Sequence, residues 1–318
     1  MALSASCNEI CVHVFSVSGD TLQSVYLCVN ATVVDLRNKL DDAGVSNAHT
    51  MDFVIGNDII CDDNKLFNGD VGTEINVYIS RKKRFVDYDT LMFAIRRWLE
   101  PDTNAKRELI KEYGDISVWD VSEIHDMHKL FENLSSFNES IGQWDTSNVT
   151  NMAYMFRGAK KFNQNIGEWN TSSVKTMNNM FDSCHAFNQP IDDWNTSAVK
   201  DMSYMFAEAT SFNQSLAHWD TSSVTNMSGM FFDTFMFNGR IDTWNTSAVS
   251  SMTAMFSGSS KFNQALRSWN TSAVTIMSMM FEGTASFNQS IGDWNTAAVT
   301  QMKGMFCDAY SFNQPIGR

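Results

Sequence analysis

The sequence predicts an α+β protein in which a small N-terminal domain precedes a solenoid of stacked repeats. Tryptophan recurs with a 25-residue period over most of the chain, and phenylalanine keeps the same step. The N-terminal quarter of the chain has a different hydrophobic pattern. Self-similarity at a fixed period is typical of repeat architectures, because each unit buries its apolar face only against its neighbours.

One repeat reads Phe-Asn-Gln-x-Ile-Gly-x-Trp-Asn/Asp-Thr-Ser-x-Val-x-x-Met-x-x-Met-Phe, followed by a five-residue link. An exposed row of tryptophans would promote aggregation, so we expect these rings to form the core. The tryptophans are Trp119, Trp144, Trp169, Trp194, Trp219, Trp244, Trp269 and Trp294. The phenylalanines are Phe137, Phe162, Phe187, Phe212, Phe237, Phe262, Phe287 and Phe312.

Spacing within a repeat predicts its local structure. Val174, Met177, Met180 and Phe181 fall on one face of a short helix, and the preceding Asn-Thr-Ser supplies oxygens that cap it. The segment from Phe162 to Trp169 is short and mixed, which favours a short strand ending in a turn.

Two sets of equivalent positions, each recurring in successive repeats as a column, allow alternative interpretations. We expect the asparagine after each phenylalanine to form a hydrogen-bonded ladder between repeats, and a row of ligand-binding amides is the alternative. The Met-x-x-Met column could bind copper through thioether groups, but core packing explains it better. The asparagines are Asn138, Asn163, Asn188, Asn213, Asn238, Asn263, Asn288 and Asn313.

The Asp/Asn-Thr-Ser-x-Val-x-x-Met-x-x-Met-Phe string resembles the BspA-type leucine-rich repeat family over roughly residues 85–318, with Trp where many members carry Phe. The resemblance implies a leucine-rich-repeat-type α/β solenoid with short strands and short helices. It assigns residues 117–318 to about eight 25-residue repeats. It also implies a binding or surface-interaction role and no catalysis.

A solenoid needs caps at both ends. Residues 85–116 are the expected helical N-terminal cap: an apolar stripe at helical spacing precedes Pro101, and a second helix is expected over 103–113, closing at Gly114. At the other end the chain stops at Arg318, before the next tryptophan is due, so another chain could supply that cap. The residues of the stripe are Leu91, Ala94, Ile95 and Trp98.

The segment 1–84 is expected to contain a hairpin, a helix and further strands. Strands are expected over 10–17 and 22–29, joined by a turn at 18–20, with later strands at 51–60 and 74–80. Thr32 and Asp35 form a capping-box pair at the start of a helix that ends at Gly44. This order resembles the ubiquitin-like β-grasp fold.

The resemblance implies a docking module and not a conjugated tag, because the basic run Arg81–Arg84 stands where ubiquitin has its Gly-Gly tail. We expect that run to be a solvated linker. By resemblance, partners bind an apolar patch on the sheet, and the matching positions are near Phe53 and Tyr78. The alternative is that both rings pack against the cap, which would make residues 1–84 part of the cap.

No catalytic constellation is evident. The chain has no phosphate loop, dinucleotide fingerprint or nucleophile elbow, and its adjacent acidic pairs point apart. His125 and His128 have metal-ligand spacing on a helix but no third ligand, so solvated histidines are favoured. We expect no enzyme activity, no metal and no cofactor.

Composition narrows the partners and the compartment. A formal net charge of −13 argues against a nucleic-acid partner, because phosphate binding needs clustered Lys and Arg. No long uninterrupted apolar stretch is present, so we expect no membrane insertion. Six cysteines without a Cys-x-x-Cys pair, and no secretory signal, favour a cytoplasmic protein.

The predicted function is a non-catalytic scaffold or adaptor that binds a protein of unknown identity. Variable surface columns over a fixed core are how solenoids build binding faces. The alternatives are a BspA-type surface adhesion protein and a hydrolase built on a parallel β-coil. Candidate binding positions in one repeat are Glu168, Lys175, Asn178, Asn179 and His185.

Overall fold

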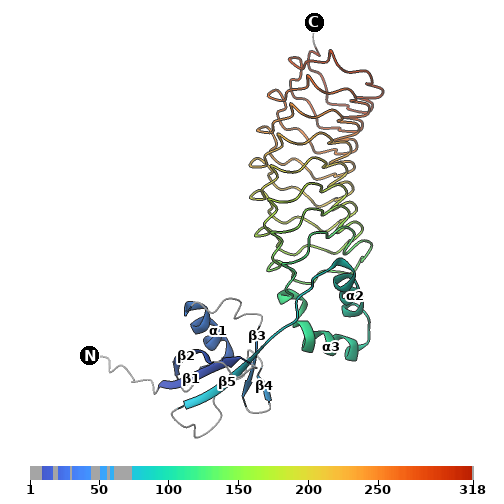
Figure 1. Ribbon diagram of the computed structural model, residues 1–318. Coiled ribbons are helices and arrows are strands. Elements are labelled where there is room, and N and C mark those ends of the chain that lie inside the picture. The colour runs from blue at the N-terminus through green and yellow to red at the C-terminus, as the bar shows by residue number, and fades with distance from the viewer. Residues whose placement is uncertain are drawn as a thin grey trace, which may run out of the picture. The chain divides into compact units, whose positions relative to one another are not determined.

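The computed structural model describes residues 9–16, 21–28, 31–43, 51–55, 58–60 and 74–316. The chain divides into two compact units, one comprising residues 1–84 and 107–120, the other residues 85–106 and 121–318. Figure 1 shows a small sheet with a helix in the first unit and a stack of coils in the second. A division falls at residue 84 as expected, but the later part of the expected cap groups with the N-terminal residues.

The N-terminal unit holds a five-stranded sheet in the order β2-β1-β5-β3-β4. β1 is antiparallel to β2 and parallel to β5, and β3 is antiparallel to both β5 and β4. The expected strand over 51–60 is two strands, while the expected turn at 18–20 and Gly44 lie outside the described residues. The strands are β1 (Glu9–Ser16), β2 (Thr21–Cys28), β3 (Met51–Ile55), β4 (Asp58–Ile60) and β5 (Glu74–Arg81).

Helix α1 (Val33–Asp42) begins at the predicted capping box. The Asp35 amide donates to Thr32 Oγ1 at 3.3 Å, and the Thr32 amide donates to the Asp35 carboxylate at 2.7 Å. The bond from the Thr32 backbone lowers the pKa of Asp35, because it stabilises the ionised carboxylate. The helix buries Val33, Leu36 and Leu40, which are the residues of its apolar face.

In the basic run that ends at Arg84, Lys83 and Arg84 are exposed, as expected of a solvated segment, and Lys82 and Lys83 also contact a helix. Lys82 Nζ donates to the carbonyl oxygens of Ile110 and Lys111 at 3.0 and 3.1 Å, and Lys83 pairs with Glu112. These acceptors lie in the last turn of α3 (Thr103–Tyr113), where helix carbonyls lack partners within the helix. Cations are favourable there, so the run anchors the end of α3.

Helix α2 (Tyr88–Trp98) covers the start of the coil stack. Tyr88 Oη donates to the His128 carbonyl at 2.9 Å, and the two rings stack with centroids 4.8 Å apart. The predicted apolar stripe is confirmed, since Leu91, Ala94, Ile95 and Trp98 are buried. Asp87 caps the helix by accepting from the Thr90 amide at 2.8 Å.

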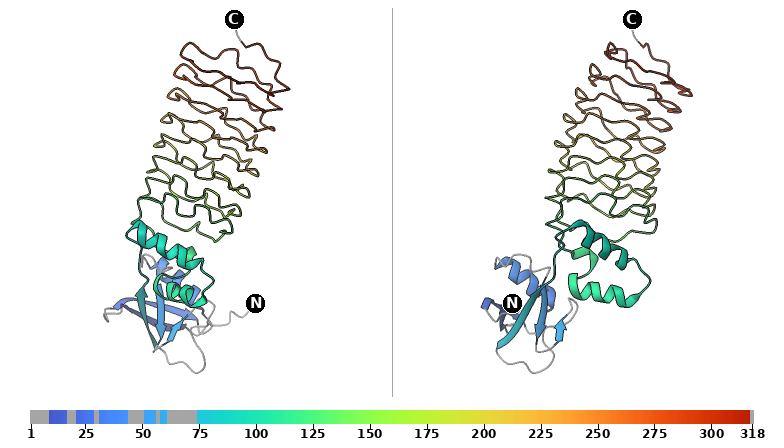
Figure 2. Two further views of the ribbon diagram at one scale, coloured as in Figure 1. Left: turned by 90° about the vertical axis from the view of Figure 1, so that its right-hand side faces the viewer. Right: turned by 45° about the vertical axis from the view of Figure 1, so that its right-hand side comes forward.

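From position 121 to position 316 the chain forms a stack of 25-residue coils, and over this range, which is described throughout, no helix is present (Figure 2). One isolated parallel bridge joins each coil to the next. The bridges connect, in order, Asp126, Asn151, Thr176, Asp201, Asn226, Ser251, Ile276 and Gln301.

The short helix predicted within each repeat was therefore wrong, and the backbone angles explain why. Asn179 and Ser183 have φ of 54° and 58°, in the left-handed region. An α-helix needs negative φ at every residue, so two left-handed residues this close in sequence prevent it. The strand expected over Phe162–Trp169 is also absent, and the bridge residue Thr176 lies in the stretch expected to be helical.

Alternate amides of this stretch bond to the next coil. Met177, Asn179 and Phe181 donate to carbonyls of the following coil at 3.0, 2.9 and 2.8 Å. The intervening amides of Met180 and Asp182 donate to carbonyls of their own coil at 3.1 and 3.3 Å, closing tight turns. The bonds from alternate amides all point in one direction along the stack. We call this arrangement the amide ladder.

Aromatic rings fill the interior between coils. Trp194 stacks on the tryptophans of both neighbouring coils with centroids 6.4 Å apart, and Phe181 lies 5.6 Å from Phe156. Trp194 is only 2% exposed. The prediction that the repeated tryptophans are core residues is confirmed, because the rings line up when identical coils stack.

Polar side chains complete the bonding between coils. Trp194 Nε1 donates to the Ile166 carbonyl at 3.0 Å, and Thr196 Oγ1 donates to the Asp220 carbonyl at 2.9 Å. Asn188 Oδ1 accepts from the Asn213 amide at 3.0 Å, and the same bond recurs in other coils. The predicted asparagine ladder is thus confirmed, and its amide oxygens are used for structure.

Trp194 gives a direct test of this core. Trp194→Ala should lower the free energy of unfolding by about 3–5 kcal/mol, because a buried ring is lost. Trp194→Phe keeps an aromatic ring but loses the bond from Nε1 to the Ile166 carbonyl, which still accepts from the Trp169 amide, so the cost should be about 0.5–1.5 kcal/mol. Urea denaturation measures both, with Phe235→Ala, at a half-exposed position, as the control. A Trp194→Ala variant that unfolds like the control contradicts the assignment.

Candidate functional site

The outward positions along the amide ladder form the most varied surface of the stack. In the coil begun by Trp169 they are Thr176, Asn178, Asn179, Asp182 and Ser183, and every other coil contributes equivalents at the same step. The backbone beneath them is fixed by bonds between coils, so the side chains change while their spacing does not. We call this surface the ladder face.

The structure separates the binding residues predicted for this repeat. Asn178 and Asn179 lie together on the ladder face, where Asn178 Oδ1 accepts from Thr176 Oγ1 at 2.7 Å, and Lys175 lies exposed at its edge. Glu168 is exposed just before the buried Trp169, on another side of the coil, and His185 lies in the turn after the ladder. These five positions do not form one site.

The register of the N-terminal sheet separates the two expected docking aromatics. Phe53 pairs with Ile79, and Tyr78 pairs with Val54. Successive residues of a strand belong to opposite faces, so Phe53 and Tyr78 lie on opposite faces of the sheet. Phe53 shares its face with the buried Val14. The docking patch near Phe53 and Tyr78 stays a prediction.

Large side chains occupy strained positions of the ladder face. Tyr154, Tyr204 and Met279 have φ of 60°, 54° and 57°, at the position held by Gly229 and Gly304 in other coils. A non-glycine residue in this region costs roughly 1–2 kcal/mol. Backbone strain of this kind is concentrated at functional sites. The sequence already shows that this position, repeated every 25 residues, holds glycine in some coils and a bulky residue in others.

Gly229 makes room for the ring of Tyr204. A Cβ on Gly229 would overlap that ring, whereas one on Gly304 would lie at an ordinary van der Waals distance of 3.5 Å from Met279 Cγ. The ring of Tyr204 therefore lies along the stack over the next coil, while the residue remains 40% exposed. Met279 is exposed to the same extent. Both side chains offer apolar surface to solvent.

The first coils of the ladder face are internally paired. Lys129 Nζ and Arg157 Cζ lie 5.6 and 5.7 Å from the ring centroid of Tyr154. Arg157 also bridges Glu132 and Asp182 at 3.4 and 3.0 Å. Cation–π and ionic contacts thus already engage the charged groups at this end.

The ladder face of the later coils differs, because three of its carboxylates have no cationic partner among the described residues. Glu208, Asp233 and Glu282 form no ion pair in the part of the chain that the structure describes. Partial burial raises the pKa of Asp233, and the charges of Glu208 and Glu282 raise it further. These carboxylates therefore repel one another across successive coils.

A groove of about 780 Å³ opens on the ladder face of the coils begun by Trp244, Trp269 and Trp294. Ile276, Met279 and Met302 supply its apolar lining, and Glu282 and Lys303 supply its charges. Met302 occupies the same column as the buried Met177 and Met277, and it is 41% exposed in the last coil. Methionine adapts its shape readily, so this lining suits a ligand of irregular outline.

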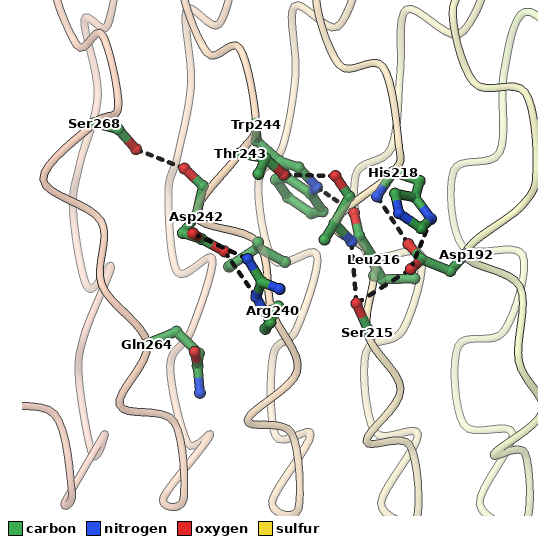
Figure 3. Close-up of polar contacts among 12 residues, drawn as sticks. Asp192, Ser215, Leu216, His218, Arg240, Asp242, Thr243, Trp244, Gln264 and Ser268 are labelled. Carbon is green, nitrogen blue, oxygen red and sulfur yellow. Dashed lines mark hydrogen bonds and ion pairs between the residues drawn. The ribbon is translucent and has the colours of Figure 1, made fainter.

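A second polar cluster lies on another side of the coils (Figure 3). Ser215 Oγ donates to the Asp192 carboxylate at 3.2 Å, and His218 Nδ1 lies 3.2 Å from the same group. The residue types are those of a hydrolase triad, but serine and histidine both contact the aspartate. The His218 amide also donates to Asp192 at 2.9 Å, so the carboxylate ties two coils together.

The two histidines with metal-ligand spacing have separate partners. His125 Nδ1 lies 2.9 Å from the Glu123 carbonyl, whereas His128 lies beside Asp126 and stacks on Tyr88. The described residues contain no group of three His, Cys, Asp or Glu side chains placed to hold a metal ion. Nor do they contain a helix long and apolar enough to cross a membrane.

The fold and this surface define a repeat protein with variable outward columns over an invariant core. A family model described as "Mycoplasma protein of unknown function, DUF285" matches residues 103–219, 157–268 and 206–318. The overlapping matches together span more than half of the chain, and the chain belongs to this family. No curated protein matches the chain. The family description supports a repeat protein and names no activity.

Gly229→Ala tests the contact between the ladder-face side chains. The variant should lose about 1–2 kcal/mol from the left-handed backbone, and on the order of 1 kcal/mol more because the Tyr204 ring is displaced. Gly283→Ala is the matched control, since φ is 63° and its Cβ would meet nothing closer than 3.6 Å. Urea denaturation should show the difference. Equal losses at both sites would mean that the ring does not lie over Gly229.

Proposed function

We propose that the chain is a non-catalytic interaction protein whose ladder face binds another protein. The main support is that Tyr154, Tyr204 and Met279 keep large side chains on the ladder face where glycine would relieve backbone strain. Aromatic side chains and methionine are enriched at protein interfaces. A strained, outward and apolar row has no role in the core, so binding is the function that it supports best.

The fold class predicted from the sequence is also proposed. We infer that the repeats form a leucine-rich-repeat-type solenoid of the BspA kind, supported by the 25-residue period and by the single parallel bridge between coils. The N-terminal sheet is proposed as a ubiquitin-like β-grasp. Its hairpin, its following helix and its parallel pairing of β1 with β5 support that proposal.

Cytoplasmic residence and a protein partner are also proposed. The thiols of Cys184 and Cys307 are free, and Cys307 is exposed, which fits a reducing compartment. The ladder-face carboxylates that have no cationic partner would repel a phosphate backbone, so nucleic acid is not the proposed partner.

Affinity capture from cells that express the protein tests the binding face. The triple variant Tyr154→Gly, Tyr204→Gly and Met279→Gly should stay folded, because glycine suits all three backbones, and should lose the captured protein. The control is Phe235→Ser with Met236→Ser, which removes apolar residues that are 47% and 50% exposed outside the ladder face. Capture of the same protein by wild type and triple variant, or by neither, contradicts the proposal.

A further inference from the structure

The ladder face is chemically asymmetric along the stack. From the coil begun by Trp194 onward, its outward positions hold five carboxylates and a single cation, Lys303. In the first coils, by contrast, Arg157 pairs with acidic neighbours on both sides. The later section is therefore acidic and, at its groove, also apolar. Its carboxylates are Asp201, Glu208, Asp233, Glu282 and Asp308.

The groove and the carboxylates lie within reach of one ligand. Glu282 lines the groove beside Met279, and its charge is close enough to affect Asp233 two coils earlier. Two coil steps correspond to about 10 Å along the stack at ordinary strand spacing. A peptide in the polyproline II conformation advances about 3.1 Å per residue with three residues per turn, so residues three apart lie on one face and roughly match this separation.

We propose that the section of the ladder face from Tyr204 to Lys303 binds a partner segment in which Lys or Arg residues flank apolar side chains. This inference rests on the proposed function and specifies the chemistry of the partner. The apolar side chains occupy the methionine-lined groove, and the cations pair with Asp233 and Glu282. Binding relieves the repulsion among carboxylates that have no cationic partner in the described structure.

The methionine side chains of the groove suit a ligand whose apolar side chains vary. Met279 and Met302 bend to fit different apolar side chains, which suits a segment recognised by pattern more than by shape. Lys303 sets one end of the site, since a cation of the ligand is repelled there.

Three labelled synthetic peptides test the proposal by fluorescence anisotropy against the full chain. They are repeats of Lys-Leu-Leu, of Glu-Leu-Leu and of Lys-Ser-Ser. The Lys-Leu-Leu peptide should bind, and added salt should weaken it, because partly exposed ion pairs are screened. The Glu-Leu-Leu peptide should fail because of charge, and the Lys-Ser-Ser peptide because it lacks apolar side chains.

Matched variants locate the binding. Asp233→Asn with Glu282→Gln should weaken the Lys-Leu-Leu peptide about tenfold, the effect of losing two partly exposed ion pairs. Glu168→Gln with Asp193→Asn removes the same charge from exposed positions outside the ladder face and should leave the affinity unchanged. Met279→Gly should weaken binding without unfolding the coil, which circular dichroism checks.

Three outcomes overturn the inference: no binding of the Lys-Leu-Leu peptide, equal binding of the Glu-Leu-Leu peptide, or equal loss in the control variant. If the peptide experiments fail but the glycine triple variant still loses its captured protein, this inference is wrong and the proposed function is unaffected. If that capture is unaffected, the proposed function itself fails.

Discussion

The amide ladder between coils is the constraint on which the rest of the structure depends. In each repeat, alternate amides such as those of Met177 and Asn179 donate to the next coil, and amides between them close turns within their own coil. The backbone donors of the stretch are thereby satisfied without a helix or a continuous strand. Because each coil supplies the partners of its neighbour, a fixed repeat length follows directly.

The same ladder explains why the tryptophan, phenylalanine and asparagine columns are constant and the outer face is not. Stacking in register places tryptophan on tryptophan and asparagine on asparagine, so any change to these residues disturbs two interfaces. The outward side chains do not stack on identical residues of the neighbouring coils. They are free to become paired, as around Arg157, or to lack a cationic partner, as at Glu208 and Glu282.

Much of this architecture could be predicted from the sequence. The period, the buried tryptophans, the asparagine ladder, the α1 capping box and the stripe of α2 all follow from spacing or from residue chemistry. The local form of the repeat could not be predicted, because apolar residues three apart suit a helix and a turn-rich coil equally well. The missed signal was the recurrence of Gly, Asn and Asp in two fixed columns, such as Asn133, Gly158 and Asp233.

The candidate site was predicted less well, because a list of variable residues does not say which share a face. Glu168 and His185 vary as Asn179 does, yet lie elsewhere on the coil. Phe53 and Tyr78 were grouped by resemblance to the ubiquitin-like fold, whereas their strands pair Phe53 with Ile79 and Tyr78 with Val54. The groove and the carboxylates without a cationic partner are formed by residues one repeat apart in the sequence. Only the stacking of the coils shows that such residues lie side by side.

The left-handed positions provide the most direct test of the amide ladder. Glu208 is exposed with φ of 54°, so Glu208→Gly should be more stable than Glu208→Ala by about 1 kcal/mol. Lys200, exposed and absent from the positive-φ residues, should show the opposite order by about 0.5–1 kcal/mol. Urea denaturation of the four variants gives both differences. If alanine is the more stable residue at position 208, as in a helix, the account of the coil is wrong.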